Sequence, residues 1–136
     1  MSNLKGKRVL VIEDDVRNLA VFATSLRQSG ASVIQDNWNT GAADFVAQNL
    51  PVDVIVLDIM LRKGLSGYDV FDQLQADPQT KDIPVIAVSS LDPETEIPKA
   101  RAKGFAGFIS KPISAVSFPD QIAKVIAGEK VWIFSR

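Results

Sequence analysis

Short apolar runs, each followed by a segment with apolar residues at helical spacing, recur along the whole chain. The clearest run is Val52–Leu57, in which Asp53 is the single polar residue. Runs of this length and composition are typical of strands that are buried on both faces of a parallel sheet. Together the runs predict five strands, at Val9–Ile12, Ser32–Gln35, Val52–Leu57, Pro84–Val88 and Phe105–Ile109.

Five helices are predicted to alternate with these strands. Asp15 is the expected N-cap of the first helix, and Gly30 is its expected stop. Asn39 or Thr40 would cap the second helix, and Ser114 would open the last one. This alternation indicates an α/β fold, in which a doubly wound parallel sheet of five strands carries helices on both faces.

Composition excludes several classes of function. The chain has 136 residues with 15 basic and 16 acidic side chains, and a net charge of −1 argues against a nucleic-acid-binding surface. It has no cysteine and no histidine, which excludes disulfides, thiolate or histidine metal sites, cysteine nucleophiles and serine–histidine triads. No segment has the length of a secretory signal or a membrane span, so we expect a single domain, residues 1–136, of a cytoplasmic protein.

Polar side chains directly follow four of the five predicted strands. The carboxyl ends of parallel strands meet at one edge of a sheet, where ligands bind in folds of this class. We therefore expect these side chains to lie in one crevice. They are Glu13, Asp14, Asp58, Ser89, Ser90 and Lys111.

The residue types in this crevice favour a phosphate and a metal ion. Three carboxylates repel one another unless a cation lies between them, and Mg²⁺ prefers oxygen ligands and also binds phosphate oxygens. A lysine and a hydroxyl opposite the metal would hold the other phosphate oxygens. The chemistry that fits is phosphoryl transfer onto a carboxylate nucleophile.

Four motifs resemble the receiver domain of two-component response regulators. They are Val9-Leu-Val-Ile-Glu-Asp-Asp15, Val54-Ile-Val-Leu-Asp-Ile-Met60, Ile83-Pro-Val-Ile-Ala-Val-Ser89 and Phe108-Ile-Ser-Lys-Pro112. They follow the family order at close to the family spacing, over about residues 7–127. The resemblance is to single-domain regulators of the chemotaxis type and implies the flavodoxin-like strand order 2-1-3-4-5. Residues 128–136 would then form an apolar C-terminal tail.

The resemblance implies that Asp58 is the phosphoacceptor. Its carboxylate would attack a phosphohistidine on a partner histidine kinase or phosphotransfer protein and become an acyl phosphate. Glu13 and Asp14 match the acidic pair that holds Mg²⁺ together with Asp58, with Asp14 as a direct ligand and Glu13 acting through water. The backbone carbonyl of Met60 is the expected third protein ligand, whereas Asp15 is expected only to cap a helix.

The resemblance also assigns the residues around the phosphoryl group. Lys111 would ion-pair with Asp58 before phosphorylation and with the phosphoryl group afterwards, so these two are the expected catalytic residues. Ser89, which precedes Ser90, matches the switch hydroxyl that moves to the phosphoryl group as the fourth helix rearranges. A purely local bond to the backbone is the alternative for Ser89. Phe108 lies where the family has its switch aromatic, and a plain core role is equally open.

The sequence departs from the family pattern at two places. Arg62 stands where the family usually has a proline, and Gly67 comes one residue late, which indicates an insertion in the loop after Asp58. Arg62 and Lys63 are expected to be solvated, and recognition of a kinase is the alternative. Pro98 predicts a fourth helix that is short and starts near Pro98, or that is broken there.

Other apolar residues bear on the lifetime of the phosphoryl group and on assembly. Met60 and Leu91 offer no group that could orient an attacking water, which predicts slow self-dephosphorylation. The tail segment Val131–Phe134 is expected to pack back on its own domain, and a docking or homodimer segment is the alternative. Trp38 raises the same question.

Three functions compete. The first is a receiver that signals by phosphorylation-dependent contact with a downstream protein, without binding nucleic acid or membrane and without enzymatic activity beyond its own phosphorylation and dephosphorylation. A receiver fragment of a larger protein would have the same sequence. The second is a non-phosphorylated interaction module on the same fold. The third is an aspartyl phosphatase or a dinucleotide binder, but Met60 replaces the phosphatase's second aspartate and Glu13–Asp15 replace a glycine-rich turn.

Overall fold

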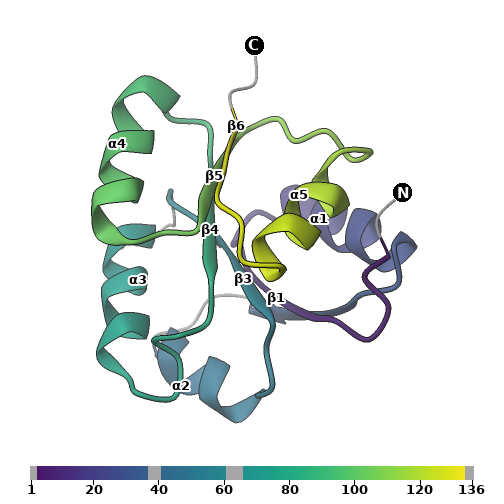
Figure 1. Cartoon of the computed structure of the whole chain (residues 1–136), viewed down its shortest axis with the longest axis horizontal. Coiled ribbons are helices and arrows are strands. Elements are labelled where there is room, and N and C mark those ends of the chain that lie inside the picture. Colours follow the sequence, from purple (N-terminus) through teal and green to yellow (C-terminus); the bar gives the residue numbers. More distant parts are fainter. Residues whose placement is uncertain (1–2, 37–40, 61–65, 134–136) are drawn as a thin grey trace.

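A computed structural model describes residues 3–36, 41–60 and 66–133 of the chain. Within these residues six strands, all paired in parallel, form one sheet in the order β2-β1-β3-β4-β5-β6 (Figure 1). The order of the first five confirms the predicted arrangement. The strands are β1 (Arg8–Ile12), β2 (Ser32–Asp36), β3 (Val54–Asp58), β4 (Val85–Ser89), β5 (Gly107–Ser110) and β6 (Val131–Ile133).

The sixth strand corrects the expectation of five. It comes from the tail, and the prediction that this segment packs back on its own domain is confirmed for the part that the structure describes. β6 lies beside β5, with Val131 opposite Gly107 and Ile133 opposite Ile109. A strand of three residues is too short for a periodicity signal, because one alternation of side chains is all that it contains.

The central strands are the most buried part of the sheet. Every residue of β3 and every residue of β4 is buried, as expected for parallel strands that are covered on both faces. β2 at the edge is mostly half-buried or exposed, which explains why its apolar signal in the sequence is the weaker one.

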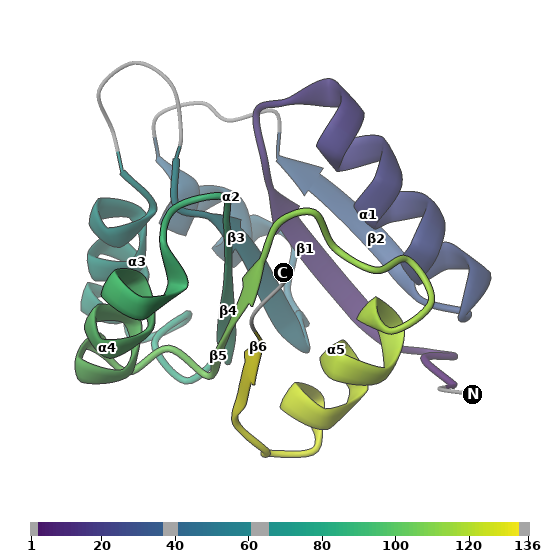
Figure 2. The ribbon, with the colours of Figure 1, turned by 90° about the horizontal axis from the view of Figure 1, so that it is seen from above.

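Helices cover both faces of the sheet, as predicted, and each face has its own apolar core. Phe22 and Phe118 meet at 5.4 Å between ring centroids in one core, and Phe71 stacks on Phe105 at 4.0 Å in the other. None of the helices in the described part of the chain is long and apolar enough to cross a membrane. One face carries α1 (Val16–Gln28) and α5 (Phe118–Ile126), and the other carries α2 (Ala42–Gln48), α3 (Gly67–Ala76) and α4 (Pro93–Lys103) (Figure 2).

Side-chain caps fix the starts of two helices next to the strand ends. The Asp15 carboxylate accepts hydrogen bonds from the backbone N–H groups of Arg17 and Asn18 at 2.9 and 3.1 Å, so the predicted cap of α1 is confirmed. Ser66 and Asp69 form a reciprocal capping box at the start of α3, which satisfies two backbone donors that the first turn leaves open.

Two predicted helix starts are wrong. α2 begins after Gly41, which has no side chain to cap it, and the expected caps Asn39 and Thr40 lie outside the described residues. α5 begins after Ser117 and not at Ser114. The Ser114 hydroxyl instead accepts the backbone N–H of Ser117 at 3.2 Å, so the capping signal in the sequence belongs to a turn that precedes the helix.

The prediction of a fourth helix broken at Pro98 is also wrong. α4 continues through Pro98, between an Asp92 cap at one end and Gly104 at the other. Pro98 has no N–H, so the Glu94 carbonyl lacks its helical hydrogen-bond donor. Both residues are exposed, so water can donate a hydrogen bond to the Glu94 carbonyl oxygen. The neighbouring residue Ile97 is buried in the core, and such packing stabilises a helix more than propensity does.

Candidate functional site

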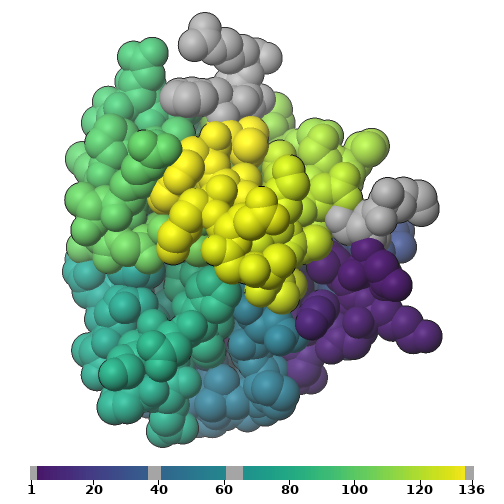
Figure 3. All heavy atoms as spheres, viewed as in Figure 1, coloured from purple at the N-terminus to yellow at the C-terminus, as the bar shows by residue number. Residues whose placement is uncertain are grey.

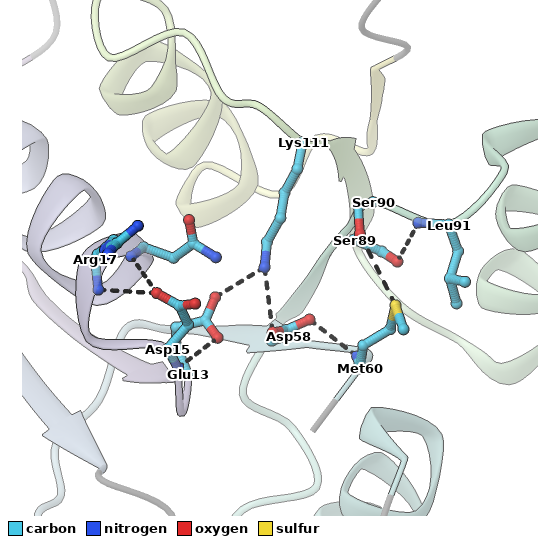
Figure 4. A network of polar contacts seen from close by, with 10 residues as sticks. Glu13, Asp15, Arg17, Asp58, Met60, Ser89, Ser90, Leu91 and Lys111 are labelled. Atoms are coloured by element: carbon cyan, nitrogen blue, oxygen red, sulfur yellow. Dashed lines mark hydrogen bonds and ion pairs between the residues drawn. The ribbon is translucent and has the colours of Figure 1, made fainter. Parts of the chain in front are cut away.

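Four strand ends bring the predicted polar side chains together at one edge of the sheet. Glu13 and Asp14 follow β1, beside Asp58 at the end of the neighbouring strand β3. From the other side β4 ends in Ser89, and Lys111 follows β5 and points toward the carboxylates (Figure 4). The expected crevice is therefore present, because the parallel register aligns the carboxyl ends of these strands.

Glu13, Asp14 and Asp58 form a cluster of carboxylates. One carboxylate oxygen from each residue lies within 4.8 Å of the oxygens from the other two. Glu13 is 1% exposed and Asp58 is 4% exposed, whereas Asp14 is half-buried. Like charges held this close favour a bound cation, and a set of oxygen donors suits a hard divalent ion such as Mg²⁺.

Lys111 is a cation that the chain itself supplies to this cluster. Its Nζ lies 2.9 Å from Glu13 Oε1 and 3.2 Å from Asp58 Oδ2 (Figure 4). The pair with Asp58 was predicted, and the pair with Glu13 was not. Burial alone would lower the pKa of Lys111, but the hydrogen bond to Glu13 and the charges of both carboxylates raise it above its usual value. Lys111 therefore stays protonated at neutral pH.

Glu13 is held by hydrogen bonds to both of its carboxylate oxygens. Oε1 accepts from Lys111, and Oε2 accepts from the backbone N–H of Asp15 at 3.2 Å. Burial first, and then the neighbouring Asp58 carboxylate, raise the pKa of Glu13 to about 7, while Lys111 acts in the opposite direction. Both carboxylate oxygens of Glu13 are therefore engaged within the protein.

The backbone around Asp58 is fixed by two close contacts. Asp58 Oδ1 accepts the backbone N–H of Met60 at 2.9 Å. Gly67, the first residue of α3, donates its N–H to the Ile59 carbonyl at 2.7 Å. A Cβ atom on Gly67 would lie 2.5 Å from the Asp58 carbonyl oxygen and 2.7 Å from Ile59 Cα. Only glycine fits this position. The sequence showed only that Gly67 comes one residue later than in the family, and the structure adds the reason why a glycine is needed there.

The two hydroxyls after β4 make local contacts in this structure. Ser89 is fully buried, and its Oγ accepts the backbone N–H of Leu91 at 3.0 Å. Ser90 Oγ lies 3.8 Å from the sulfur of Met60, which reaches across from the end of β3 (Figure 4). Ser89 thus makes the local backbone bond that was the alternative to a switch role.

The remaining predicted residues divide into three groups. Phe108 is fully buried in the core on the α4 side of the sheet, so its core role is present and its switching role stays a prediction. The Met60 carbonyl likewise stays a predicted metal ligand. Trp38, Arg62 and Lys63 lie outside the described residues.

A contact between α3 and α4 was missed from the sequence. The Tyr68 hydroxyl donates to Glu96 Oε1 at 2.8 Å, and Glu96 is buried. Burial and the Glu96 carboxylate both raise the pKa of Tyr68. No pattern in the sequence pairs these two residues, because they come from helices 28 positions apart that only the fold brings together.

Comparison with known proteins identifies the family of this chain. The model of the response regulator receiver domain matches residues 9–123. The chain belongs to the response regulator receiver family. This receiver is 33% identical over 116 residues to the polar-differentiation response regulator DivK of Brucella ovis, covering 85% of this chain and 93% of that protein. The same values hold for DivK of Brucella anthropi.

Solved structures share the fold of this receiver. A response regulator from Desulfuromonas acetoxidans superposes with a TM-score of 0.78 at 27% identity, over 89% of this chain and 97% of that chain. The Francisella response regulator 1452 receiver domain gives a TM-score of 0.79 at 24% identity, over 90% and 98% of the two chains. At that lower identity the likeness concerns the fold alone.

Proposed function

We propose that this receiver accepts a phosphoryl group on Asp58 from a histidine kinase or phosphotransfer protein and signals through phosphorylation-dependent contact with a downstream protein. The observation that carries the proposal is the position of Lys111, whose ammonium contacts Glu13 and Asp58 at the rim of a three-carboxylate cluster. An acceptor carboxylate, a fixed cation and a set of metal ligands are the parts that phosphoryl transfer requires.

The proposed transfer is a displacement at phosphorus. One carboxylate oxygen of Asp58 forms the P–O bond while the P–N bond of the donor phosphohistidine breaks, and the electron pair stays with the imidazole nitrogen. Lys111 Nζ, 3.2 Å from Asp58 Oδ2, lies where it can neutralise charge on the transferred group. The Met60 N–H holds Asp58 Oδ1 and so orients the carboxylate. Mg²⁺, when bound, would neutralise further charge on the phosphoryl oxygens.

The donor set supports Mg²⁺ as the cofactor. Asp14 and Asp58 are the proposed direct ligands, with the Met60 carbonyl as the third protein ligand and Glu13 acting through water. One ammonium cannot neutralise three carboxylates, so the pocket favours a further cation of high charge.

Ser89 is the proposed switch. Its hydroxyl gives up the bond from the Leu91 N–H, which is 3.0 Å long in this structure, and turns to the phosphoryl oxygens. The start of α4 at Pro93, two residues beyond Leu91, and its Asp92 cap would move with it. An unchanged backbone from Ser89 to Asp92 in the beryllofluoride-bound protein would contradict this switch.

The test of the function is intact mass after incubation with Mg²⁺ and a small phosphoryl donor such as acetyl phosphate. We expect one added phosphoryl group in the wild-type chain and none in Asp58→Asn. Asp44→Asn, which alters an exposed carboxylate on α2, is the matched control and should be modified like the wild type. Folded wild-type protein that takes up no phosphoryl group would overturn the proposal in favour of a constitutive interaction module.

A further inference from the structure

β6 closes the side of the sheet next to β5. Figure 3 shows the yellow C-terminal segment at the surface between α4 and the yellow-green connection that leads to α5. Val131 is 6% exposed and donates its backbone N–H to the Ala106 carbonyl at 3.1 Å. Gly128, with a φ of +98°, turns the chain from α5 back toward the sheet. β6 is therefore a docked strand and part of the core.

β5 has a residue that fits this docking. Gly107 lies opposite Val131 in the β5–β6 ladder. A Cβ atom on Gly107 would come within 2.5 Å of the Val131 carbonyl oxygen, a distance that real Cβ atoms do not reach. The absence of a side chain at Gly107 therefore lets β6 approach β5 closely.

Trp132 links β6 to α4. It is the ladder partner of Phe108, and aligned residues on neighbouring parallel strands project from the same face of a sheet. Trp132 is half-buried against the core on the α4 side. The Arg101 guanidinium of α4 lies 4.8 Å from the centroid of the Trp132 ring. Strand pairing with β5 and the contact with Arg101 of α4 thus both hold Trp132 in place.

This contact is connected to the candidate phosphorylation site by two routes. Along the sheet, Ala87, Phe108 and Trp132 form one row across β4, β5 and β6, and Ser89 follows Ala87 by two residues on β4. Along α4, the helix runs from its Asp92 cap, close to Ser89, to the turn that carries Arg101. A shift at Ser89 that moves α4 also moves one of the two surfaces that hold Trp132.

We propose that β6 is a strap that is fastened in the unphosphorylated receiver and released by phosphorylation, with Trp132 as the point of attachment to α4. The proposal rests on the function proposed above. Release uncovers the edge of β5 and the α4 side of Phe108, and it replaces a covered face by a strand edge with unpaired backbone groups. An extended apolar segment of a downstream protein fits such an edge by strand addition.

The first test uses the full chain loaded with Mg²⁺ and beryllofluoride. Trp38→Phe leaves Trp132 as the single tryptophan, because the chain has two. We expect hydrogen exchange of the amides of Val131–Ile133 to become at least about tenfold faster on loading, and acrylamide quenching of Trp132 to at least about double. The amides of β1, on the other side of β3 from β4 and β5, should not exchange faster on loading and serve as the internal control.

The second test uses reciprocity. If loading releases β6, then loosening β6 must favour loading by the same factor. Trp132→Ala, or Arg101→Ala if the first variant does not fold, should bind beryllofluoride at least about fivefold more tightly than the wild type. Val116→Ala, at a residue that is 87% exposed, should leave the affinity unchanged.

The outcomes separate this inference from the proposed function. A protein that is loaded, as shown by fluorine NMR of the bound beryllofluoride, but whose β6 amides exchange at the unloaded rate would overturn the strap alone. Unchanged affinity in both variants would do the same. A protein that neither loads nor takes up a phosphoryl group would overturn the proposed function, and the strap with it.

Discussion

Lys111 lies closer to Glu13 than to the proposed phosphoacceptor Asp58, at 2.9 Å against 3.2 Å. The lysine therefore holds two carboxylates at once, and Glu13 competes with Asp58 for its charge. Asp14 adds a third carboxylate to the same pocket. The stability of this part of the protein should depend on which cations are present.

Removal of the lysine should make folding depend on Mg²⁺. Lys111→Met leaves the buried Glu13 and Asp58 carboxylates without their cation, which should lower the free energy of unfolding by about 3 kcal/mol in metal-free buffer. Saturating Mg²⁺ should restore a large part of this loss, because it binds the folded pocket and not the unfolded chain. Urea denaturation with and without Mg²⁺ measures both values.

A surface lysine provides the matched control for that experiment. Lys103 pairs at 2.9 Å with Asp72, whose side chain is 61% exposed. Lys103→Met should cost no more than about 1 kcal/mol, with no dependence on Mg²⁺. An equal loss for Lys111→Met in both buffers would show that the lysine does not share its pocket with a metal.

A side chain at Gly67 should disturb the site through the backbone. In Gly67→Ala the new Cβ would lie 2.5 Å from the Asp58 carbonyl oxygen, so β3 or α3 must shift. We expect a loss of about 1–3 kcal/mol of unfolding free energy in urea, together with slower phosphorylation by a small donor. Gly6→Ala is the control, since Gly6 has a φ of +80° and nothing within 4 Å of the added atom. It should lose stability by backbone strain while phosphorylation keeps its rate.

The hydroxyl of Tyr68 should stabilise the pairing of α3 with α4. Tyr68→Phe removes the 2.8 Å hydrogen bond to the buried carboxylate of Glu96, and should cost about 2 kcal/mol as a bond to a charged acceptor. The loss should be smaller in a Glu96→Gln background, where the acceptor is neutral. A double-mutant cycle without coupling between these two positions would contradict the assignment.

The same contact gives a pH dependence with a defined sign. The pKa of Tyr68 is raised in the folded protein, by burial first and then by Glu96, so the folded state holds the phenol proton more tightly than the unfolded chain does. The stabilisation is therefore fully present below the ordinary tyrosine pKa of about 10 and is lost as the pH rises above it. The difference in unfolding free energy between wild type and Tyr68→Phe should be constant from about pH 7 to 9 and shrink above about pH 10.

The sequence predicts the sheet and the contents of the crevice because both depend on local patterns. Apolar runs such as Val52–Leu57 specify buried parallel strands, and the topology then brings the residues that follow them together. Asp58 and Lys111 are found in this way without knowledge of any side-chain conformation. The Glu13–Lys111 pair is not, since it depends on how two side chains 98 positions apart turn within the pocket.

The remaining errors arise where tertiary contacts override a local signal. Pro98 signals a helix break, but α4 is stabilised by the burial of Ile97 and Ala100 and tolerates one lost hydrogen bond. The need for glycine at position 67 cannot be seen in the sequence, because it arises from the Asp58 backbone that the fold places beside Gly67. β6 depends on a close approach to Gly107, which a one-dimensional pattern does not contain.

Met60 should set the lifetime of the phosphoryl group. Its side chain is 52% exposed beside Asp58, and its sulfur contacts the Ser90 hydroxyl at 3.8 Å. Neither Met60 nor the half-buried Leu91 carries a group that could hold or deprotonate an attacking water, so self-dephosphorylation should be slow. Met60→Asn adds such a group and should accelerate phosphoryl loss by about tenfold or more, within the range of general acid–base effects.

Met60→Leu is the control for this prediction, because it keeps the apolar shape and should retain the wild-type rate. The decay of the phosphorylated mass after removal of the donor measures all three, and equal rates for the Asn and Leu variants would show that Met60 does not control access of water to the acyl phosphate.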